Sequence, residues 1–317
     1  MNIQVVCVGS AYGEIVYTTK SLEVNMLPDR LRTFVANQAR VSASDAQIGC
    51  GGGGFIAAAT LAKLGVSTAF VGKLGQDSFG CEVVRKLKEC KVEISQAQQT
   101  THLATAVQTT IRSPKDDSFE VSTTAFAPSF ERRNASLPSA EWLYLSGPFK
   151  DLADLKVLLT EAQRLGMRTC IRLERTDLSN ARKLIKILQK ADVCCFEQDD
   201  AELLTHQPDP RLILESLRSS GLKTLLLQDG AAAGYALHDG YFYRTKAKSK
   251  LKYINKLGVS EVFAPAFLAS NLNCASVESS LDFALLAARS VAHFVGSEAG
   301  LLQNIPHRPG KVAKDFI

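Results

Sequence analysis

The 317-residue sequence has no long hydrophobic run. Its most apolar segment, 283–295, is interrupted by Arg289 and His293, whereas a membrane-spanning helix needs about 18 or more apolar residues in succession. The opening residues, MNIQVVCVGS, lack the basic segment and following apolar stretch of a secretory signal. We therefore expect a cytoplasmic protein without a membrane partner.

The sequence also lacks the patterns of several kinds of site. Its 8 cysteines form no C-x-x-C pair, and its 5 histidines show no ligand spacing, so no zinc site is expected. No G-x-x-x-x-G-K-[ST] motif occurs, which excludes a P-loop nucleotide site. The formal net charge of +5 is small for this length, and basic residues alternate with acidic ones. We therefore expect no nucleic-acid partner.

From about residue 140, short apolar runs alternate with stretches of helical periodicity. The runs are 142–146, 169–173, 192–196 and 223–227, and the helical stretches between them are 151–165, 178–191 and 210–220. Residues 5–8 and 68–71 resemble the same kind of strand, and Asp151 is a possible N-cap of the helical stretch that it begins. This alternation predicts a parallel sheet covered by helices.

Two regions depart from this alternation. Residues 104–112 and 118–124 are Thr-rich and predict an antiparallel hairpin, and 15–48 is partly strand-like without a strong helix. Asp239-Gly240 marks another hairpin turn. Because no repeat or linker divides the chain, we predict one domain over 1–317 with a small sheet beside the main one.

A glycine-rich stretch, GCGGGGFIAAATLAKLG at 49–65, matches the dinucleotide fingerprint G-x-G-x-x-G through Gly49, Gly51 and Gly54. That fingerprint requires a buried strand immediately before it and an acidic residue at the end of the next strand. Here the preceding residues, VSASDAQI, are too polar for a central strand, and Asp77 lies in a glycine-containing loop. We interpret the stretch as a turn where backbone approaches a small ligand before a helix begins.

Residues 51–87 contain paired glycines, then a helix ending in L-A-x-L-G, then V-G-x-x-G-x-D-x-F-G. The matching positions are Gly51, Gly52, Leu61, Ala62, Leu64, Gly65, Gly72, Gly75, Asp77, Phe79 and Gly80. This pattern resembles the first signature of the ribokinase (PfkB) family of carbohydrate kinases, and the resemblance extends from Val5 to about Pro306.

The resemblance implies a doubly wound, mainly parallel α/β sheet flanked by helices, with a β lid from parts of 10–48 and 98–126. It also implies transfer of the γ-phosphate of ATP, with Mg²⁺, to a hydroxyl of a sugar or nucleoside. In the family an Asp at a helix N-terminus is the base, and the amides of that helix form an anion hole. Homodimers formed through the lid are common in the family.

On the catalytic side, the family motif D-T-x-G-A-G-D aligns with residues 255–261, so the resemblance puts the base at Glu261 and the anion hole at Gly258, Val259 and Ser260. The extra methylene of Glu displaces the carboxylate by about 1 Å, and a base must lie roughly 2.6–3.2 Å from the hydroxyl. A β-branched Val259 is unfavourable if the amides require a positive φ, and Pro265, near the first turn, removes a donor. An ordinary glycine turn before a buried helix explains these residues equally well.

The ligand side differs from the family in the same way. Gly51 and Gly52 correspond to the substrate turn, and Glu14 stands where an Asp binds substrate hydroxyls. Ile56 stands where an Asn binds a hydroxyl, and it can neither donate nor accept a hydrogen bond. The nucleotide-binding T-x-G corresponds to Gln228 and Gly230.

Two charged groups allow two interpretations each. The Asn-x-x-Glu that helps place magnesium corresponds to Glu197 and Asp200, which either hold Mg²⁺ through water or complement a helix dipole without metal. Lysines recur with period two and would share one face of a strand, where they either attract nucleotide phosphates or discourage edge aggregation: Lys246, Lys248, Lys250 and Lys252. The metal-free and edge-strand interpretations are favoured.

Two functions follow from the sequence. One is an active ATP-dependent sugar or nucleoside kinase with Glu261 as base. The other is a pseudokinase that keeps the fold and binds a metabolite or a protein partner. The altered site positions, set against an intact structural motif, favour weak or lost phosphoryl transfer with a retained binding or regulatory role.

Overall fold

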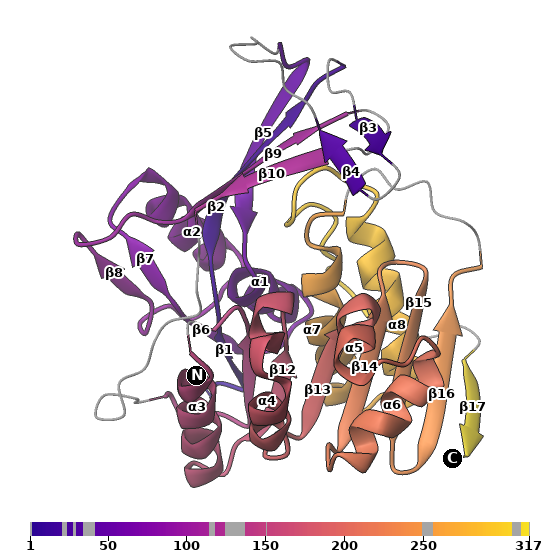
Figure 1. The fold of residues 1–317 in the computed structure, drawn as a ribbon. Helices are drawn as coiled ribbons and strands as arrows, with labels where there is room; N and C mark the ends of the chain where they lie inside the picture. Colours follow the sequence, from indigo (N-terminus) through magenta and orange to yellow (C-terminus); the bar gives the residue numbers. More distant parts are fainter. Residues whose placement is uncertain are drawn as a thin grey trace.

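The described residues of the computed structural model are 2–20, 24–27, 30–33, 42–113, 118–123, 137–149, 151–248, 256–305 and 312–316. They form a central sheet in the order β17-β16-β15-β14-β13-β12-β11-β1-β6 (Figure 1). Six strands are parallel: β1 (Val5–Val8), β6 (Thr68–Val71), β11 (Trp142–Ser146), β12 (Arg168–Arg172), β13 (Val193–Glu197) and β14 (Thr224–Asp229). Three antiparallel strands extend one edge: β15 (Ala233–His238), β16 (Tyr241–Lys246) and β17 (Ala313–Phe316).

The parallel strands are apolar because helices cover both faces of the sheet. One face carries α1 (Gly53–Lys63), α7 (Val259–Leu272) and α8 (Val277–Val291), whose buried side chains form one apolar cluster with Val5 and Cys7. The other face carries α3 (Leu152–Arg164), α4 (Ala181–Leu188), α5 (Gln198–Thr205) and α6 (Pro210–Ser219), which pack on Val6 and Val8. The predicted α/β fold is confirmed, with element ends shifted by a few residues.

Local signals explain several helix ends. The Asp151 side chain accepts a hydrogen bond from the Ala153 amide and caps α3, as expected from its position. Asp77 caps α2 (Ser78–Glu89) by accepting from the Gly80 amide. The predicted helix at 178–191 instead begins with the 3-10 turn η1 (Arg175–Asn180) before α4. No helix among the described ranges is long and apolar enough to cross a membrane.

A four-stranded sheet lies above the carboxyl ends of the central strands (Figure 1). Its order is β10 (Ser118–Ser122), β9 (Val107–Arg112), β2 (Tyr12–Thr18) and β5 (Asp45–Gly51). The β9–β10 pairing confirms the predicted hairpin, although its turn at 114–117 lies outside the described residues. The last four residues of the polar stretch before the glycines, 45–48, begin β5 and are exposed, which explains why they lack the pattern of a central strand.

Two short pairings complete the described strands: β3 (Val24–Leu27) with β4 (Arg30–Thr33), and β7 (Lys73–Gly75) with β8 (Gln98–Thr100). Other parts of the expected lid, such as 34–41 and 124–126, lie outside the described residues. The division into one domain with a moving lid therefore stays a prediction.

The lysine-rich strand ends earlier in the structure than the sequence predicted. β16 ends at Lys246, so Lys248 lies beyond the strand, and Lys250 and Lys252 lie outside the described residues. The Asp239-Gly240 hairpin between β15 and β16 is confirmed, with Asp239 at φ 47° and Gly240 at φ 83°.

Candidate active site

A cavity of about 500 Å³ lies between the small sheet and the carboxyl ends of the parallel strands. The segments that follow β1, β11 and β12 supply Ser10, Pro148 and Glu174, and the small sheet supplies Tyr12, Gln108, Glu120 and Ser122. The remaining walls include Gly52, Gly53, Lys256, Leu257, Gly258, Ser260, Glu261 and Ser297. Strand β1 lies between β6 and β11, so the strand order changes direction there. Ligands of open α/β sheets bind at such switch points.

The glycine turn lets the start of α1 approach the end of β1 closely. Gly52 has φ 102°, and a Cβ there would lie 2.6 Å from the Ser10 carbonyl oxygen. A Cβ on Gly51 would lie 2.5 Å from the ring of Tyr12. Gly52 lines the cavity, but Gly51 does not, so part of the glycine requirement is internal packing.

The N-terminus of α7 forms another wall. Gly258 has φ 76°, and a Cβ there would lie 2.3 Å from the Ser297 carbonyl oxygen. Gly258, Ser260 and Glu261 line the cavity, while Val259 is buried. The first amides of a helix have no intrahelical acceptor, so this turn has the arrangement of an anion-binding helix N-terminus.

Neither of two residues that were expected to disturb the N-terminus of α7 does so. Val259 does not adopt a positive φ, because Gly258 makes the turn and the helix already begins at Val259. Pro265 lies in the second turn, where the N–H it lacks would have bonded to the carbonyl of Glu261. The first turn therefore keeps its amides.

Three carboxylates face the cavity: Glu120, Glu174 and Glu261. Burial raises the pKa of Glu174 to about 7, with the Arg172 guanidinium opposing the rise and the Glu261 charge adding to it. Burial and then the Glu261 charge raise the pKa of Glu120. Lys256 is the one basic residue among the described residues of the lining, and Glu261 accepts a 3.2 Å hydrogen bond from the Ser260 hydroxyl.

Glu14 does not line this cavity. Its buried carboxylate accepts a 2.7 Å hydrogen bond from the Ser297 amide and a second, short one from the Ser297 hydroxyl. Burial raises the pKa of Glu14 to about 7 although both Ser297 bonds oppose the rise, and the Glu261 and Glu298 charges add to it. The longer side chain reaches the C-terminal segment rather than the cavity.

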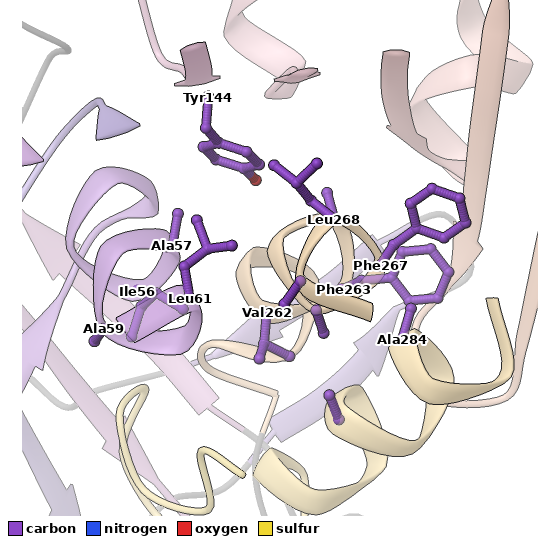
Figure 2. Close-up of a cluster of buried hydrophobic side chains, with 14 of the residues drawn as sticks. Ile56, Ala57, Ala59, Leu61, Tyr144, Val262, Phe263, Phe267, Leu268 and Ala284 are labelled. Carbon is purple, nitrogen blue, oxygen red and sulfur yellow. The ribbon is translucent and has the colours of Figure 1, made fainter. Parts of the chain in front are cut away.

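Ile56 is fully buried and does not line the cavity, which corrects its expected place among the substrate-binding residues. Figure 2 shows it on α1 within the apolar cluster that joins α1 to α7. A buried isoleucine at this position stabilises the fold because it removes apolar surface from water.

Gln228, at the end of β14, is also buried. Its side-chain amide donates to the carbonyl oxygens of Gly230 and Val259, both at 2.9 Å, and so ties β14 to the first residue of α7. Gly230 itself is exposed, with φ 48°.

Arg172 was not among the residues expected at the site from sequence. This buried guanidinium at the end of β12 donates to the Ser260 carbonyl at 3.1 Å and to the carboxylates of Glu174 and Glu197 at 3.3 and 2.9 Å. The signal for it was an arginine inside the apolar run TCIRL, because arginines are seldom buried without partners.

The proposed metal-binding carboxylates both have arginine partners. Glu197 accepts from Arg172, and Asp200 accepts from the Nε of Arg175 at 2.7 Å. Within the described ranges, no group of three or more His, Cys, Asp or Glu side chains can hold a metal ion. The donor set therefore does not fit a magnesium ion at this pair.

The chain resembles known kinases over nearly all its length. Residues 3–303 match the family model described as pfkB family carbohydrate kinase. A ribokinase from Arabidopsis thaliana, solved with ribose and ATP, is similar in structure with TM-score 0.75 and 20% identity, covering 94% of this chain and 95% of that one. An adenosine kinase from Sinorhizobium meliloti has TM-score 0.76 and 16% identity, covering 95% of this chain and 98% of that one.

A nucleoside kinase from Methanocaldococcus jannaschii has TM-score 0.71 and 15% identity, with 94% of each chain covered. At these identities the structural likeness establishes the fold alone, whereas the family model spans most of the sequence. The chain belongs to the pfkB family of carbohydrate kinases.

Proposed function

We propose that this protein binds a sugar or nucleoside in the cavity below the small sheet, and that its ATP-dependent phosphoryl transfer is weak or lost. The proposal rests on one observation: side chains at the positions where the family binds its ligands form hydrogen bonds within this protein. Glu14 bonds to Ser297, and the Gln228 amide bonds to two carbonyl groups. A hydroxyl or nucleotide would have to displace these buried bonds, which costs free energy. A binding or regulatory role follows.

An active kinase is the second candidate, because Glu261 lines the cavity at the first turn of α7. In that reaction the acceptor hydroxyl gives its proton to the Glu261 carboxylate, and its oxygen bonds to the γ-phosphorus of ATP as ADP leaves. The amides around Gly258, Val259 and Ser260 would stabilise the charge on the transferred phosphoryl group. On the nucleotide side, Gly230 is the exposed candidate contact.

The proposal includes a cytoplasmic, single-domain protein over 1–317 in which the small sheet acts as a lid. It also includes a homodimer formed through that sheet. Size-exclusion chromatography with light scattering checks the dimer, which requires twice the 34.4 kDa chain mass.

The first test measures ADP release from ATP and Mg²⁺ across a panel of sugars and nucleosides. We expect turnover far below about 1 per second, the lower end of the usual range for kinases. Turnover at or above that rate refutes the loss of catalysis. Thermal unfolding with ATP, ADP and the same panel tests binding, and no shift with any of them refutes a small-molecule ligand.

Glu261→Asp tests whether the length of the candidate base limits catalysis. Shortening the side chain restores the carboxylate position of the family, so activity should rise if Glu261 is the limiting defect. Glu141→Asp, the same substitution at an exposed glutamate outside the cavity lining, is the matched control and should leave turnover unchanged.

A further inference from the structure

We propose that Arg172 and Arg175 take the place of a divalent cation at the acidic pair Glu197 and Asp200, so that this pair binds no Mg²⁺. The inference goes beyond the proposed function, since it applies whether or not the protein transfers phosphate. It depends on how two neighbouring strands end.

The geometry brings each arginine to one carboxylate. Strands β12 and β13 are parallel neighbours, with Arg172 opposite Cys195, so the side chain of Arg172 reaches Glu197, the last residue of β13. Its Nη2 lies 2.9 Å from the Glu197 carboxylate. The chain then enters η1 at Arg175, whose Nε lies 2.7 Å from Asp200 in the first turn of α5.

Arg172 needs the Glu197 carboxylate because its guanidinium is buried. Its side chain is only 5% exposed, and removing one partner of a buried ion pair leaves an uncompensated charge. Burial opposes its charge, but the carboxylates of Glu261, Glu174 and Glu197 raise the pKa of Arg172 above its ordinary value. Glu197 therefore cannot turn toward a metal without weakening the stabilisation of this guanidinium.

In the second pair the buried member is the carboxylate, Asp200. Its side chain is 10% exposed, and its Oδ1 accepts from the guanidinium of Arg175, whose own side chain is 65% exposed. A cation at this pair would lie close to two guanidinium groups, of which that of Arg172 is buried. The buried Oε1 of Gln198 has no partner among the described residues, but one neutral oxygen does not make a site for Mg²⁺, which binds through carboxylates and phosphates.

The closing experiment titrates nucleotide-free protein with Mn²⁺, a paramagnetic substitute for Mg²⁺, and follows free Mn²⁺ by electron paramagnetic resonance. Wild type should bind no Mn²⁺ at millimolar concentration. Arg175→Gln, at an exposed position, releases Asp200 and should give measurable Mn²⁺ binding, at least about tenfold tighter than the limit that the wild-type titration sets. Adding Asp200→Asn to that variant should abolish the gain.

Arg164→Gln is the matched control. Arg164 is 66% exposed and pairs with Glu161, so its removal changes the net charge equally at a place without a second carboxylate partner. Arg175→Gln and Arg164→Gln binding Mn²⁺ equally overturns the inference. So does Mn²⁺ binding by wild type that Asp200→Asn removes.

A nucleotide titration separates this inference from the proposed function. The affinity for ADP should change less than about twofold between millimolar MgCl₂ and excess EDTA, because guanidinium groups already pair with both carboxylates. A loss of about tenfold or more in EDTA contradicts the inference. Complete absence of ADP binding counts against the nucleotide of the proposed function, while the Mn²⁺ result still decides the role of the arginines.

Discussion

Replacing Glu14 by Gln should stabilise the protein at alkaline pH. The carboxylate is buried, and burial raises its pKa from 4.5 to about 7. A glutamine of the same shape can accept from the Ser297 amide through its oxygen and donate to the Ser297 hydroxyl through its nitrogen. The substitution therefore removes the charge and keeps both hydrogen bonds.

The sign follows from proton binding. Between pH 4.5 and about 7 the folded protein binds the Glu14 proton more tightly than the unfolded chain, so the free energy of unfolding falls as pH rises. The whole rise in pKa corresponds to about 3 kcal/mol at most, because each pKa unit is worth about 1.4 kcal/mol. Most of this loss, about 2–3 kcal/mol, falls between pH 5 and pH 8.

Urea unfolding, followed by circular dichroism at several pH values, measures the effect. The stability gap between Glu14→Gln and wild type should open with rising pH, and it should shrink toward zero near pH 4.5. A gap that does not depend on pH, or a variant less stable than wild type at pH 8, would refute the reasoning. Glu174 keeps its own raised pKa in both proteins and cancels from the comparison.

Two further substitutions test the backbone and the core. Gly258→Ala places a Cβ 2.3 Å from the Ser297 carbonyl oxygen at a positive φ, so it should lower the free energy of unfolding by about 3 kcal/mol or more. Gly166→Ala, at φ 70° with open space around it, should lower it by only about 1 kcal/mol. Equal losses in urea unfolding would contradict the close approach of Gly258 to Ser297. Tyr144→Phe should raise the free energy of unfolding by about 1 kcal/mol, because the buried Tyr144 hydroxyl has no hydrogen-bond partner among the described residues (Figure 2). A lower free energy of unfolding in the same assay would mean that the hydroxyl does form a hydrogen bond.

The fold could be predicted because its signals are local. The run WLYLS became β11 with the expected bounds, and Asp151 capped α3 as its position before an apolar periodicity suggested. The glycine turn before α1 was also recognised. These features depend on residues close together in the sequence, so one segment contains enough information to identify each of them.

The partners of the site residues could not be predicted in this way. Glu14 meets Ser297 across 283 positions of the sequence, and Arg172 meets Ser260 across 88. Ile56 was expected beside the ligand because of its place in a family pattern, but the packing of α1 against α7 buries it. Such contacts depend on tertiary packing, which one sequence does not reveal through propensity or spacing.

Ser297 contacts two walls of the cavity. Its amide and hydroxyl hold Glu14 of β2, and its backbone lies against Gly258 at the start of α7. The small sheet and the start of α7 thus both contact the same residue, although they come from distant parts of the chain. A substitution at Ser297 therefore changes the packing of the small sheet and of the start of α7 together.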